Sequence, residues 1–84
     1  MKTKVRLRID LFERDKFYDN RVRVKEGVIG YIDGYIRYDG WAHAVVVFKN
    51  RIEFIQPGNL EPIGIMNEAE IKAFFTSPID TKDE

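Results

Sequence analysis

The stretch RVRVKEGVIGYIDGYI, residues 21–36, decides the fold of this 84-residue chain. On both sides of Lys25-Glu26-Gly27, valines and isoleucines alternate with other residues, which is the side-chain period of a β-strand. Gly27 suits the positive φ of a tight turn. Gly30 and Gly34 fall on the same side of the second run, which predicts a bent strand that another backbone approaches closely. The stretch therefore predicts two strands joined by a turn.

The same alternation separates inward from outward side chains. We expect the aliphatic side of the stretch to build the core: Val22, Val24, Val28, Ile32 and Ile36. We expect the opposite side to be exposed: Arg21, Arg23, Lys25, Tyr31 and Tyr35.

Further strands are predicted before and after this stretch. Apolar residues alternate with charges over residues 4–11, and residues 12–20 interrupt the pattern as a loop. The sequence Tyr38-Asp39-Gly40-Trp41 predicts a hairpin with a type I′ turn that joins residues 28–37 to a strand over residues 42–48. Another strand follows over residues 51–55, with Ile52 and Phe54 expected to point inward.

The end of the chain predicts a short turn, a last strand and a helix. Residues 57–60 (PGNL) indicate one short helical turn. Pro62 places the strand over residues 61–65 at an edge or a closure point of the sheet. Asn67 and Glu70 have the spacing of a capping box, and the helix that follows carries a stripe of Ile71, Phe74 and Phe75.

Size and composition indicate one ordinary globular domain. The chain is 44% hydrophobic and 33% charged, and it has no cysteine. We expect a single domain over residues 1–79 and a disordered acidic tail over residues 80–84. No apolar run approaches the ~20 residues that span a bilayer. These features predict a cytoplasmic protein without disulfides and without a membrane partner.

The order of strands and turns resembles the SH3-like small β-barrels, a group that includes KOW-type and Tudor-like modules. The residues that carry the resemblance are RVRVKEGVIGYIDGY at 21–35 and RIEFIQPGNLEPI at 51–63. In that group the second segment supplies a strand, a 3₁₀ turn and the last strand. The resemblance implies a mainly β fold, a barrel of five to six antiparallel strands with a short C-terminal α-helix. It covers residues 21–65 and leaves the first strand and the helix as additions.

Within this group the chain is also similar to the plasmid-encoded type II dihydrofolate reductases, which are tetramers of such barrels. The family's active-site Gln, Ile and Tyr fall on Glu53, Phe54 and Ile55 of this sequence, so none of the three is preserved. The resemblance implies shared architecture. An oligomeric barrel enzyme or ligand binder of this kind is the alternative interpretation.

No motif for catalysis, a cofactor or a metal is present in the sequence. The single histidine, His43, lies between two alanines in a predicted strand, where a structural role is the simpler interpretation. The chain has no Ser-His-Asp arrangement, no phosphate-binding glycine loop that leads into a helix, and no metal-ligand spacing. We therefore expect no enzymatic activity, no cofactor and no bound metal.

Basic residues on two predicted strands suggest nucleic-acid binding. Residues 1–25 hold nine Lys or Arg against four Asp or Glu. If the two strands lie side by side, six cations share one face that could follow a phosphate backbone: Lys4, Arg6, Arg8, Arg21, Arg23 and Lys25. Tyr31, Tyr35 and Trp41 could then stack on bases. The alternative is that these cations pair with residues 57–84, which hold six acidic residues against two basic ones.

Apolar residues on the outward side of the predicted sheet suggest protein binding. That side is too apolar to stay uncovered: Ile29, Tyr31, Tyr35, Val45, Val47 and Ile55. The helix stripe could cover it within the same chain, or a second subunit or another protein could do so. The sequence therefore predicts a non-enzymatic small binding module for a protein or nucleic-acid partner. Such a module could modulate a larger complex. The sequence leaves homo-oligomerisation open.

Overall fold

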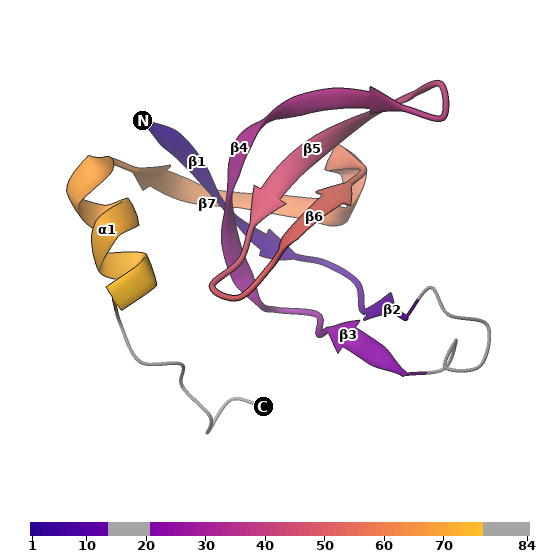
Figure 1. Cartoon of the computed structure of the whole chain (residues 1–84), viewed down its shortest axis with the longest axis horizontal. Helices are drawn as coiled ribbons and strands as arrows, with labels where there is room; N and C mark the ends of the chain where they lie inside the picture. Colours follow the sequence, from indigo (N-terminus) through magenta and orange to yellow (C-terminus); the bar gives the residue numbers. More distant parts are fainter. Residues whose placement is uncertain (14–20, 77–84) are drawn as a thin grey trace.

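The computed structural model describes residues 1–13 and 21–76 of the chain. These residues form a mainly β structure with one helix (Figure 1). The elements are β1 (Lys2–Leu7), β2 (Leu11–Phe12), β3 (Val22–Val24), β4 (Ile29–Tyr38), β5 (Trp41–Val47), β6 (Ile52–Ile55), the 3₁₀ turn η1 (Pro57–Asn59), β7 (Leu60–Met66) and α1 (Glu68–Thr76).

Five strands form one antiparallel sheet in the order β6-β5-β4-β1-β7, and β2 pairs with β3 in a separate ribbon. β1 lies in the interior of the large sheet, where Val5 is opposite Gly30 of β4 on one side and Pro62 of β7 on the other. The prediction that the first strand is an addition to a barrel beginning at residue 21 is therefore wrong. β1 is a central strand.

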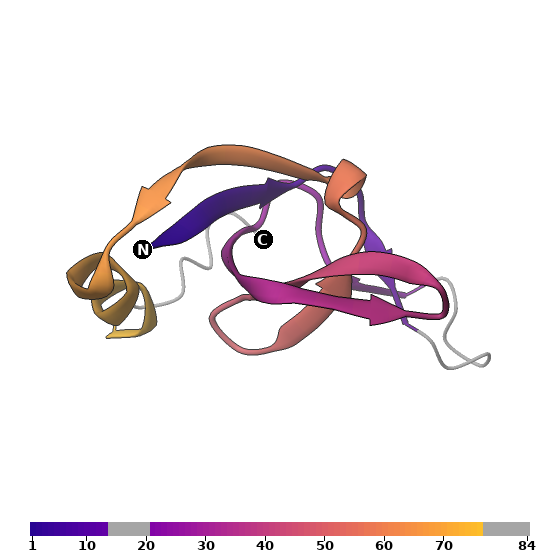
Figure 2. The ribbon, with the colours of Figure 1, turned by 90° about the horizontal axis from the view of Figure 1, so that it is seen from above.

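β4 bends and contributes to two layers of the molecule. Its first part pairs with β1, and its longer second part pairs with β5. Figure 2 shows β1 and β7 in one layer, with the β4–β5 hairpin in the other. At Gly30 a Cβ atom would lie 2.6 Å from the carbonyl oxygen of Val47 and 2.9 Å from Cδ1 of Phe48. Glycine is required there because the backbone of β5 comes too close for any side chain.

The core draws on nearly every strand, and its members come from both layers. Its buried members are Val5, Leu7, Val24, Ala44, Val46, Phe48, Ile55 and Leu60. Of the five residues predicted to build the core, Val24 is buried, and Val22 and Ile32 are partly buried. Val28 and Ile36 are exposed, so the prediction is wrong for these two residues.

A bulge in β4 explains the exposure of Ile36. Ile32 is opposite Val46, but Gly34 is opposite Val45, so Asp33 is an extra residue in the ladder. Because one extra residue exchanges the two faces of a strand, Ile36 and Tyr38 lie on the same side as Tyr31. Val28 is exposed for a different reason, since it precedes β4 and lies in the connection from β3.

The two faces of β6 are also the reverse of the prediction. Ile52 and Phe54 are exposed, whereas Glu53 and Ile55 are buried. The turn at Lys49 and Asn50, closed by a 2.8 Å bond from the Phe48 N–H to the Arg51 carbonyl oxygen, sets this register. Glu53 is thereby placed opposite the buried Val46.

The helix begins as the sequence predicts and covers part of the sheet. The Glu70 N–H donates to Oδ1 of Asn67 at 2.9 Å, and the Asn67 N–H donates to Oε1 of Glu70 at 3.2 Å, which completes a capping box. Ile71 and Phe74 pack on a second apolar cluster of Tyr31, Val47 and Met66. Tyr31 is only 7% exposed, so its predicted exposure for base stacking is wrong.

Several local predictions are confirmed. Asp39 and Gly40 have φ values of 52° and 81°, as a type I′ turn requires, and Gly27 has a φ of 93°. η1 occupies the predicted helical turn, and β7, which contains Pro62, forms one edge of the sheet.

The first strand ends at Leu7, earlier than predicted, and Phe12 belongs to β2 instead of a loop. The predicted tail over residues 80–84 lies outside the described residues.

Candidate binding surfaces

The outer side of β4, β5 and β6 carries a group of exposed apolar side chains. Cross-strand register places Tyr38 opposite Trp41, Val45 opposite Phe54, and Val47 opposite Ile52. Because these pairs share one side of the sheet with Ile36, they form a continuous surface. We call it the outer aromatic face, and its members are Ile36, Tyr38, Trp41, Ile52 and Phe54.

Aromatic contacts hold this face in place. The Tyr38 ring meets the His43 ring edge-on, with 5.6 Å between centroids, and it lies 6.5 Å from the Phe54 ring. Nδ1 of His43 lies 3.0 Å from the carbonyl oxygen of Trp41, which can only accept, so this nitrogen donates. His43 therefore bridges residues of the hairpin, in keeping with the structural role predicted for it.

The outer aromatic face continues the surface that α1 covers. Tyr31 and Val47 lie on the same side of the sheet but under the helix, where Phe74 and Phe75 meet the Tyr31 ring edge-on. In Figure 1, α1 lies beside the N-terminal end of β1, and the β4–β5 turn points away from it. The helix thus covers one end of an apolar side and leaves the other end exposed. Trp41 remains 66% exposed.

The predicted face of six cations does not form. Within residues 1–13 and 21–76, β1 lies between β4 and β7, and β3 pairs with β2, so the two basic strands are not neighbours. Arg6 donates to Glu61 of β7 at 3.1 Å, and Lys2 pairs with Asp33 at 3.2 Å. The alternative that basic residues of the first strand pair with acidic residues of the C-terminal third is confirmed for Arg6.

Arg23 is engaged by a buried carboxylate. Its Nε and Nη2 donate to the two oxygens of Glu53 at 3.0 and 2.9 Å, and Arg51 approaches the same carboxylate at 3.5 Å. The Arg23 and Glu53 side chains are 12% and 10% exposed. The hydrogen bond to Glu53 raises the pKa of Arg23 above its ordinary value, although burial opposes the shift. The pair joins the β2–β3 ribbon to β6.

The role of Glu53 was missed in the sequence because apolar Ile52 and Phe54 are the expected inward residues of such a strand. Its carboxylate is held by Arg23 and Arg51. Of the other predicted site residues, Arg8, Arg21 and Tyr35 are exposed. Tyr35 is opposite the buried Ala44 and so lies on the other side of the sheet from Trp41.

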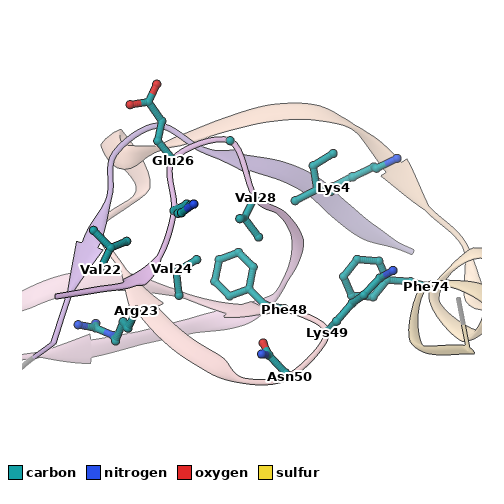
Figure 3. Close-up of a pocket in the computed structure, with 13 residues that line it drawn as sticks. Lys4, Val22, Arg23, Val24, Glu26, Val28, Phe48, Lys49, Asn50 and Phe74 are labelled. Carbon is teal, nitrogen blue, oxygen red and sulfur yellow. The ribbon is translucent and has the colours of Figure 1, made fainter. Parts of the chain in front are cut away.

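A hollow of about 860 Å³ brings together three of the predicted cations (Figure 3). Lys4 of β1, Arg23 of β3 and Lys25 line it. Lys49, which sequence reasoning did not single out, and Phe74 of the predicted helix stripe also belong to the lining. Figure 3 shows Phe48 in the middle of the lining, with Val24 and Val28 beside it. The hollow thus combines an apolar interior with cationic residues.

Comparisons with protein-family models, curated proteins and solved structures found no match for the chain. Within residues 1–13 and 21–76, no group of three or more His, Asp or Glu side chains is arranged to hold a metal ion. In the same described part, no helix has the length and apolar character needed to cross a membrane.

Proposed function

We propose that this protein is a non-enzymatic binding module that recognises another protein through the outer aromatic face. The observation that carries the proposal is the exposure of Tyr38, Trp41 and Phe54 on one side of an ordered sheet. Exposed apolar patches of this kind mark interaction sites, and Trp and Tyr are the residues that contribute most to such interfaces. Since the five members carry no charge, the surface suits an apolar protein surface better than a phosphate backbone.

We also propose that the bent sheet is an SH3-like barrel. Two features support this assignment: η1 connects β6 to β7, as the resemblance implies for residues 51–63, and β4 contributes to both layers. In this proposal β1 is one of the barrel strands and α1 is the addition. The barrel presents the outer aromatic face on strands, which hold side chains more rigidly than loops do.

Capture of partners from the source cell tests the proposed function. The bait is the full chain, and the test variant is Trp41→Ser, which changes a side chain outside the core. Truncating a central interface tryptophan costs about 2 kcal/mol, which is a roughly thirtyfold weaker dissociation constant. We expect the wild type to retain a specific protein after nuclease treatment and Trp41→Ser to lose it.

Tyr35→Ser is the matched control. Tyr35 is 64% exposed, nearly as much as Trp41 at 66%, but it lies on the other side of the sheet. We expect it to retain the partner. Equal capture by Trp41→Ser and the wild type contradicts the proposal, and loss of the captured protein on nuclease treatment indicates nucleic-acid binding instead. A wild-type dimer in light scattering that Trp41→Ser converts to a monomer would assign the face to self-association.

A further inference from the structure

The wall of the hollow is held by backbone bonds that tie the β3–β4 connection to the first strand. The Gly27 N–H donates to the Leu7 carbonyl oxygen at 2.8 Å, and the Leu7 N–H donates to the Val28 carbonyl oxygen at 3.0 Å. In addition, the Glu26 N–H donates to the side-chain Oδ1 of Asp10 at 2.8 Å. The hollow is therefore a preformed feature of the fold, and a ligand would not have to order this connection.

Apolar side chains from separate parts of the chain meet in the interior of the hollow. Val24 and Phe48 reach it from the core, and Val28 is an exposed aliphatic side chain beside them. Phe74 of α1 closes one side, so the helix completes the lining. The volume of about 860 Å³ lies within the range of small-molecule sites.

The charged residues around this apolar interior are mainly cationic. Lys4, Lys25 and Lys49 belong to the lining, and Nζ of Lys49 lies 5.8 Å from the centroid of the Phe74 ring. Arg23 also lines the hollow, but its guanidinium is engaged by Glu53. Among the described residues of the lining, Glu26 is the only acidic one, and its carboxylate points away from the hollow in Figure 3.

We propose that the hollow binds a small amphipathic anion, a carboxylate with an aliphatic stem. The stem would lie on Val28, Phe48 and Phe74, and the carboxylate would be attracted by the ammonium groups of Lys4 and Lys25. Lysine ammonium groups act as point charges on long stems, so they accept an anionic head without demanding one fixed geometry. This site is separate from the outer aromatic face and does not depend on the proposed function.

Titration of the ¹⁵N-labelled 84-residue chain with decanoate tests the proposal by residue-resolved NMR. A ligand of this size with one charged group has an expected dissociation constant on the order of 1 mM. We expect saturable shifts at the amides of Gly27, Val28 and Asn50. Acetate, which lacks the stem, and decyltrimethylammonium, which reverses the charge, should leave these amides unchanged. Equal shifts with decyltrimethylammonium, or no saturable shift with decanoate, overturn the proposal.

Two variants test whether Lys4 and Lys25 attract the carboxylate of decanoate. The double variant Lys4→Gln/Lys25→Gln should bind decanoate roughly fivefold more weakly, because two partly exposed ion pairs are lost. Lys72→Gln, which removes an exposed lysine of α1 outside the lining, should bind as the wild type does. Unchanged binding of decanoate by the double variant overturns the proposal. Chemical-shift changes that decanoate causes only at the amides of Trp41 and Phe54 overturn it too. Trp41→Ser should retain decanoate binding, so failure at either surface can be recognised separately.

Discussion

Among the individual residues, Glu53 stands out because its charged side chain is buried. Its carboxylate lies on the inner side of β6 and accepts both hydrogen bonds of the Arg23 fork. A buried pair of this kind stabilises little compared with two apolar residues, but removing one partner leaves the other charge without compensation. Since Arg23 and Glu53 belong to different sheets, the pair fixes how the β2–β3 ribbon sits against β6.

We therefore predict that Glu53→Ala lowers the free energy of unfolding by about 3–5 kcal/mol. The reason is that Arg23, with a side chain that is 12% exposed, keeps its charge and loses its partner. Urea unfolding measures the change. Glu61→Ala is the matched control, because its pair with Arg6 is about half exposed on both sides, and it should cost less than about 1 kcal/mol. Equal losses for the two variants would contradict a buried role for Glu53.

At the scale of elements, α1 determines the environment of Tyr31. Ile71 and Phe74 pack against the cluster that contains Tyr31, and the rings of Phe74 and Phe75 lie 5.9 and 6.1 Å from the Tyr31 ring. Burial raises the pKa of Tyr31 above its ordinary value, and the charge of Asp33 adds to the shift. The folded protein therefore holds the Tyr31 proton more tightly than the unfolded chain does.

This pKa shift predicts a loss of stability in alkali. The contribution of Tyr31 is fully present below its unfolded pKa of about 10 and is lost as the pH rises through the higher folded value. Denaturant unfolding of the wild type and Tyr31→Phe between about pH 8 and pH 11 measures it. We expect the wild type to lose stability relative to Tyr31→Phe above about pH 10. A difference that stays constant over this range would show that α1 does not shield the hydroxyl group.

At the scale of the whole molecule, β1 connects the two layers. It pairs with β4 on one side and with β7 on the other, and its inward side chains Val5 and Leu7 are 0% and 1% exposed. The two layers share one core through these side chains. We therefore expect the described part of the chain to unfold as a single unit.

Leu7→Ala tests this expectation. Loss of a fully buried leucine should cost about 2–5 kcal/mol, and the cost should be the same by two probes. Trp41 fluorescence reports on the β4–β5 hairpin, and far-ultraviolet circular dichroism reports on the whole chain. Both transitions should move together in urea. Separate midpoints for the two probes would show that the hairpin unfolds independently of β1.

Local features of this protein were determined by its sequence alone. The Asp39-Gly40 turn, the positive φ of Gly27, the capping box of α1 and the edge position of the strand with Pro62 all follow from residues close together in the chain. Each depends on backbone preferences or hydrogen bonds that act over a few residues. Helix periodicity likewise placed Ile71 and Phe74 on one stripe, whereas their packing on the cluster of Tyr31, Val47 and Met66 is a finding of the structure.

Only the tertiary structure decided which side of each strand faces the core and which strands are neighbours. The extra residue Asp33 turns Ile36 outward, and the register of β5 and β6 turns Glu53 inward. Pairing of β1 with β4 and β7 separates the two basic strands and creates the hollow beside Lys4. These outcomes depend on pairing between segments far apart in sequence. Alternation in the sequence shows that a strand has two different sides. The partner strands and the bulges determine which of these sides faces the core.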